Sequence, residues 1–96
     1  MAVKINEIYT NVTEENFNDF FLEFVEIVLK EGKDIYGYKV IRGYVDECED
    51  ADDNDYNVAA FGVTCDNSTP FGFTVYLDQI ESVKVIQPLW KTEWMQ

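Results

Sequence analysis

Histidine is absent from this 96-residue chain. It is the side chain whose charge changes most readily near neutral pH, and it is the commonest general base and metal ligand in proteins. Two cysteines without any histidine do not make an ordinary structural zinc site. Glycine-rich phosphate loops and the Gly-x-Ser-x-Gly nucleophile motif are missing as well. Carboxylate-pair or tyrosine chemistry stays open, but we predict that the protein is not an enzyme and has no cofactor and no metal site.

Long hydrophobic runs are also missing. The most apolar stretch, residues 20–29, is interrupted by Glu23 and Glu26, which argues against a membrane span. The first ten residues include Lys4 and Glu7 and contain no apolar segment of the kind found in signal peptides. We therefore expect a cytoplasmic protein, which would act in the cytoplasm of a host cell if a phage encodes it.

Basic residues are scarce, because lysine and arginine together number 7 against 19 aspartates and glutamates. The formal charge of −12 repels nucleic acids and anionic membranes, so neither is an expected partner. Solubility alone is served by a net charge of magnitude about 2–8 in a small domain. Halophilic adaptation or chance would also explain the excess, but we favour a positively charged protein partner.

Composition and length favour one folded domain over residues 1–96. Hydrophobic residues make up 47% and aromatic residues 16% of the chain, which is too much for a disordered protein. Cys48 and Cys65 are predicted to be free thiols. In a hairpin closed around 49–55, Cys65 would face Lys39, too far from Cys48 for a disulfide.

One helix is predicted over about residues 14–31. Thr13 is a good N-cap, two glutamates follow it in the first turn, and Gly32 is a good C-cap. Large apolar residues then recur at three- and four-residue steps, as on one face of a helix: Phe17, Phe20, Phe21, Phe24 and Val28.

After Gly32 the apolar pattern changes to a period of two, which is typical of strands. The predicted strands cover about residues 35–46, 59–65, 71–77 and 83–86. A turn is expected at 66–70, and Pro88 ends the last strand. The predicted fold is α+β, with the 14–31 helix packed on a four-stranded antiparallel meander.

The connection between the first two predicted strands is very acidic. It has seven carboxylates within residues 46–55: Asp46, Glu47, Glu49, Asp50, Asp52, Asp53 and Asp55. Asp50, Asp52 and Asn54 imitate the start of a calcium-binding loop, but Asp55 replaces its glycine and Phe61 its bidentate glutamate. The segment is then a solvated hairpin loop, an irregular weak cation site, or a surface that binds a basic partner, and we favour the last.

The predicted helix adds a second acidic feature. Glu15, Asp19, Glu23 and Glu26 would fall within one stripe opposite the phenylalanines. Carboxylates four residues apart on a helix are separated by about 6 Å along its axis. A DNA strand has one phosphate per roughly 3.4 Å. The stripe is either the wet face of the helix or, together with the acidic loop, part of a surface that imitates a nucleic-acid backbone.

Aromatic side chains offer two further candidate contacts. Trp90 and Trp94 are four residues apart in the tail, and they either dock on the fold or form an interface hot spot. Four tyrosines fall in the predicted strands and would make a second interface if several are exposed together: Tyr36, Tyr38, Tyr44 and Tyr76.

In size, charge and lack of catalytic groups, the chain resembles the small acidic proteins with which phages and mobile elements block host nucleases, such as anti-CRISPR and anti-restriction proteins. This resemblance assigns no role to individual residues. It implies a stoichiometric inhibitor that presents the 46–55 loop and the Glu15–Glu26 stripe to the basic groove of a nuclease or CRISPR effector. The alternatives are an immunity protein or antitoxin that neutralises a basic toxin, and a weak cation-binding accessory domain.

Overall fold

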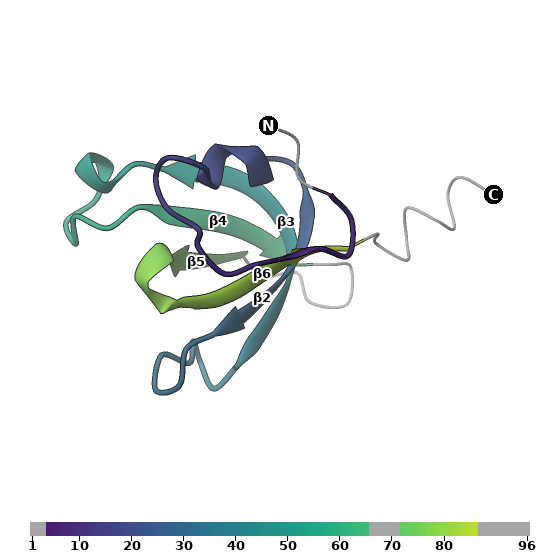
Figure 1. Ribbon diagram of the computed structural model, residues 1–96. Helices are drawn as coiled ribbons and strands as arrows, with labels where there is room; N and C mark the ends of the chain where they lie inside the picture. Colours follow the sequence, from purple (N-terminus) through teal and green to yellow (C-terminus); the bar gives the residue numbers. More distant parts are fainter. Residues whose placement is uncertain (1–3, 66–71, 87–96) are drawn as a thin grey trace.

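The computed structural model describes residues 4–65 and 72–86, which form six β-strands and three short 3₁₀ helices (Figure 1). The strands are β1 (Ile8–Tyr9), β2 (Phe24–Leu29), β3 (Val40–Glu49), β4 (Ala60–Cys65), β5 (Gly72–Tyr76) and β6 (Ile80–Val85). The 3₁₀ helices are η1 (Phe17–Phe20), η2 (Ala51–Asp53) and η3 (Leu77–Gln79).

All six strands belong to one antiparallel sheet with the order β1-β6-β2-β3-β4-β5. β5 lies at one edge and β6 next to the other edge, yet η3 joins them through only three residues. The sheet therefore has to curl so that its two ends approach each other (Figure 1). β3 pairs with β2 on one side and with β4 on the other. Its register with β4 shifts between Val45 and Glu47, where a bulge lets the long strand bend.

The core fills the concave side of this curled sheet. Along β2, the alternate residues Val25, Ile27 and Leu29 are buried. η1 closes the space by placing Phe17 and Phe20 against Phe61 of β4, with ring centroids 6.1 and 5.9 Å away. Further large side chains that are fully buried come from β3 to β6: Val45, Val63, Val75 and Val83.

The predicted helix over 14–31, and with it the α+β class, is wrong. Thr13 does cap a turn, because its Oγ1 accepts a hydrogen bond from the Glu15 amide at 3.2 Å. The helical turn ends at Phe20, and Leu22 then takes a positive φ of 65° before β2 begins. β2 lies between β6 and β3, so its backbone groups bond to both neighbours and its apolar run suits a central strand. Tertiary pairing therefore overrides the helical spacing of the phenylalanines.

The four predicted strands overlap β3 to β6, but their arrangement is not a meander of four. β6 pairs with β2, the segment predicted to be helical, and does not pair with β5. The 35–46 prediction merges two features, since Ile35 and Tyr38 form a separate tight hairpin before β3 starts at Val40. The hairpin register also differs from the prediction, because Cys65 pairs with Gly43 and not with Lys39.

Two predicted features lie outside the described residues: the turn at 66–70, and the tail that contains Trp90 and Trp94. Within the described ranges, no helix has the length and apolar character needed to cross a membrane.

Candidate partner-binding surface

The acidic segment 46–55 is only partly a loop, because β3 continues to Glu49. Asp46 occupies the bulge of β3, where its carboxylate accepts a hydrogen bond from the Thr64 hydroxyl of β4. Glu47 and Glu49 follow along the strand, opposite Gly62 and Ala60 of β4. The sheet itself therefore fixes three of the seven predicted carboxylates, and two of them, Glu47 and Glu49, were predicted to lie beyond the end of the strand.

The remaining four acids are displayed from a structured turn around η2. The Asp50 carbonyl accepts a hydrogen bond from the Asp53 amide at 3.0 Å. Asn54 then fixes the turn from inside, because its Nδ2 donates to Glu49 Oε1 at 2.9 Å and to the Val58 carbonyl at 2.8 Å. Asp50, Asp52, Asp53 and Asp55 are all exposed on this turn. It lies at one end of the molecule (the teal turn at the left of Figure 1).

Glu14 adds an eighth carboxylate to these seven, and the sequence did not single it out as a site residue. Its Oε1 accepts a hydrogen bond from the Ala51 amide at 3.1 Å. Glu14 precedes Ala51 by 37 residues, so only the folded sheet brings the two together. We call the seven predicted carboxylates of 46–55 together with Glu14 the acidic surface.

Aromatic rings lie beside the acidic surface. Tyr56 is 71% exposed, and its ring meets that of Tyr76 edge to face with centroids 5.2 Å apart. Desolvation, followed by the nearby Tyr56, Glu49 and Asp55, raises the pKa of the Tyr76 hydroxyl. The hydroxyl therefore stays neutral, and this pair adds apolar contact area next to the carboxylates.

The predicted stripe of four acids is not formed, because the helix that would carry it does not exist. Glu15 lies before η1, Asp19 lies within η1, and Glu23 lies between η1 and β2. Glu26 is in β2, where its Oε2 accepts a hydrogen bond from Arg42 Nε at 2.8 Å. Arg42 and Lys84 are its cross-strand neighbours on either side, so Glu26 sits in a basic environment.

Among the described residues, the basic side chains are confined to one part of the sheet. No lysine or arginine occurs between Arg42 and Lys84, a stretch that includes the second half of β3, all of β4 and β5, and η3. The basic residues in the described ranges lie in the N-terminal segment, the β2–β3 connection, β3 and β6: Lys4, Lys30, Lys33, Lys39, Arg42 and Lys84. The acidic surface is therefore not neutralised by cations of its own chain nearby in the sequence.

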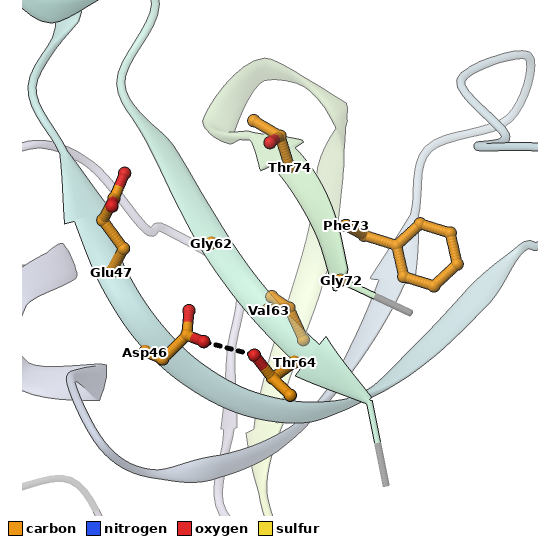
Figure 2. A pocket seen from close by; sticks show the side chains of 8 residues that line it. All are labelled: Asp46, Glu47, Gly62, Val63, Thr64, Gly72, Phe73 and Thr74. Atoms are coloured by element: carbon orange, nitrogen blue, oxygen red, sulfur yellow. Dashed lines mark hydrogen bonds between the residues drawn. The ribbon is translucent and has the colours of Figure 1, made fainter. Parts of the chain in front are cut away.

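A shallow hollow of about 240 Å³ lies on the outer side of β3, β4 and β5 (Figure 2). Asp46 and Glu47 line it from β3, while Gly72 and Thr74 line it from β5. Figure 2 shows that the Phe73 ring points away from the two carboxylates. The hollow thus offers carboxylate and hydroxyl oxygens, which suits a cationic group.

Cys48 has a free thiol that faces the interior, and its Sγ lies 3.5 Å from the Phe17 carbonyl oxygen, to which it donates a hydrogen bond. Burial, followed by the charges of Asp50 and Glu47, raises the pKa of this thiol from 9.0 to about 11. Because the folded-state pKa is above the unfolded one, the neutral thiol stabilises the fold below about pH 9. That contribution is lost as the pH rises toward 11.

Alkylation of Cys48 by iodoacetamide at pH 8 is expected to be about 100-fold slower than that of an unstructured cysteine, because the thiolate fraction falls tenfold per unit of pKa. The rate would be measured by mass spectrometry in a Cys65→Ser background, so that only one thiol reacts. The same variant in concentrated urea is the control and should react at the ordinary rate. Equal rates in the two conditions would contradict the raised pKa.

Within the described residues, no group of three acidic or cysteine side chains is arranged to hold a metal ion. Comparisons with protein-family models, curated proteins and solved structures find no match to this chain. The geometry and charge of the chain are therefore the basis for its function.

Proposed function

We propose that this protein is a non-catalytic inhibitor that binds the basic surface of a partner protein through its acidic surface. The observation that carries the proposal is the fixed turn after β3, where hydrogen bonds from Asn54 and to Glu14 hold a dense group of carboxylates in a stretch of sequence without lysine or arginine. Mutual repulsion among these carboxylates raises the free energy of the isolated protein, and a bound cationic surface relieves it. The proposal includes that the protein acts in the cytoplasm.

The partner class that fits best is a nucleic-acid-binding protein, such as a nuclease or a CRISPR effector. Such proteins hold phosphates with lysine and arginine side chains in a groove. The carboxylates of 46–55 would occupy these cations and exclude the nucleic acid by competition. The Tyr56–Tyr76 pair would add desolvated contact beside them. The Glu15–Glu26 stripe has no part in the proposal, because its helix is not formed.

Replacing Asp50, Asp52, Asp53 and Asp55 together with asparagine is expected to weaken binding to the partner about 30-fold, if each exposed charge contributes about 0.5 kcal/mol. Folding should be unchanged or slightly improved, because these side chains repel one another. The experiment captures basic proteins from a nuclease-containing lysate at low and high salt. It then measures inhibition of nucleic-acid cleavage by the captured protein.

A matched pair of double variants separates the surface from net charge. Asp52→Asn with Asp53→Asn removes two charges from η2, while Glu31→Gln with Asp34→Asn removes two from the β2–β3 connection. The first pair should reduce affinity severalfold and the second by less than twofold. If both pairs reduce affinity equally, only the net charge matters and the acidic surface is not the binding site.

A further inference from the structure

β5 forms one edge of the sheet, and its outer side has no partner strand among the described residues. The Leu77 amide donates to the Ala59 carbonyl at 2.8 Å, which fixes the phase of the β4–β5 ladder. Since hydrogen-bonded pairs alternate in antiparallel ladders, Phe61–Val75 and Val63–Phe73 are the bonded pairs. The N–H and C=O groups of residues 72, 74 and 76 consequently point away from β4.

One of these outward groups already has a partner. The Tyr76 amide donates to Oε1 of Gln79 at 3.0 Å, so the side chain of η3 caps that end of the edge. Gly72 and Thr74 are exposed, and the structure shows no partner for their outward backbone groups within the described ranges. An unpaired edge of this kind is where an extended chain adds to a sheet.

The two faces beside this edge differ in chemistry. On the outer face lies the hollow with Asp46 and Glu47. On the other face, the Phe73 ring meets Tyr38 and Tyr36, with centroids 5.7 and 6.2 Å away. Tyr36 is 89% exposed and has a positive φ of 50° at the tip of the tight hairpin that Gly37 completes. A bulky residue rarely adopts this conformation, and here it keeps an aromatic ring exposed next to β5.

We propose that the β5 edge binds an extended segment of the partner whose side chains alternate between basic and apolar residues. Successive side chains of a strand point to opposite faces of a sheet. Basic side chains of the added strand would therefore lie over the hollow with Asp46 and Glu47, and apolar ones would pack against Phe73, Tyr38 and Tyr36. The inference rests on the proposed function, because it takes the partner to be basic, and it adds where and in which conformation the partner binds.

The test uses a short synthetic peptide of alternating arginine and valine at low ionic strength, with two N-methylated forms of equal charge. One form is methylated on the arginine amides and the other on the valine amides. Only one set of amides faces β5, so one form should lose about tenfold in affinity, as expected for the loss of one or two backbone hydrogen bonds. The other form should bind like the parent peptide.

A protein variant supplies the complementary test. Thr74→Pro removes the outward N–H and leaves the β4–β5 ladder intact, because proline is tolerated on the open side of an edge strand. This variant should bind the parent peptide with reduced affinity, because the Thr74 N–H no longer donates to it, while the outward carbonyls of Gly72 and Thr74 should still distinguish the two methylated forms. If it does not fold, hydrogen exchange of the native protein replaces it. The Thr74 amide should be protected upon peptide binding, whereas the Val75 amide, already bonded to β4, should not change.

Three results would overturn the proposal. Equal affinity for all three peptides would show that cations bind without using the edge, and it would leave the proposed function intact. The parent peptide could also fail to bind although a basic partner is captured through the acidic surface. That result would again remove the edge from the binding site and leave the proposed function intact. A native protein that is dimeric without peptide and monomeric as Thr74→Pro would assign the edge to a second copy of this chain.

Discussion

Replacing Phe61 with alanine is expected to lower the free energy of unfolding by about 4 kcal/mol. The ring is fully buried and contacts both aromatic residues that η1 contributes to the core, Phe17 and Phe20. Small domains have a total stability of about 5–15 kcal/mol, so the loss is a large part of the whole. Urea denaturation followed by tryptophan or tyrosine fluorescence measures it.

The control for this change is Ile8→Ala, because Ile8 is 64% exposed on β1. Its effect should remain within about 0.5 kcal/mol, as for surface substitutions in general. Loss of the η1 packing would also affect the 46–55 turn, because Glu14 precedes η1 and holds that turn through Ala51. If Phe61→Ala changed stability by less than 1 kcal/mol, the packing of η1 on β4 described above would be wrong.

Gly43→Ala is the other change with a large expected effect, a loss of about 3 kcal/mol. Gly43 is in β3 and pairs with Cys65 of β4. A Cβ at this position would collide with the Thr64 carbonyl oxygen and would lie 2.9 Å from Val63 Cγ1. The carbonyl belongs to the backbone and cannot turn aside like a side chain, so β3 and β4 would have to separate.

Gly72→Ala provides a matched control for this collision. Gly72 is also in a strand of the same sheet, but a Cβ there would be 3.6 Å from its nearest neighbour, the Val63 carbonyl oxygen. This is an ordinary van der Waals distance, and we expect little change in the thermal midpoint. Similar midpoints for Gly43→Ala and Gly72→Ala would refute the close approach of β3 and β4.

Sequence patterns predicted strands that overlap β3, β4 and β5, but they assigned the residues of β2 to a helix. The segment Phe24–Leu29 satisfies two periods at once, because Phe24 and Val28 continue the helical spacing of the phenylalanines while Val25 and Ile27 alternate. Which period prevails is decided by β3 and β6, which supply hydrogen bonds on both sides of β2. β6 is distant from β2 in the sequence, so no local rule reveals that pairing.

The candidate site shows the same limit. The density of carboxylates in 46–55 was visible in the sequence and led directly to the proposed surface. The role of Glu14 was not, since its contact with Ala51 spans 37 residues and follows from the packing of η1 near β3. Glu26, by contrast, was predicted to be part of an acidic stripe, and only the β2–β3 register reveals that Arg42 already binds it.

The pairing of β6 with β2 has a consequence for how the chain folds. β3, β4 and β5 follow one another and pair with their neighbours, so this part of the sheet can assemble from local contacts. β2 becomes an interior strand only when Val83 and Val85 arrive from the other end of the sequence. During synthesis, the apolar run Phe24–Leu29 therefore has to wait, with one edge open, until β6 has also left the ribosome.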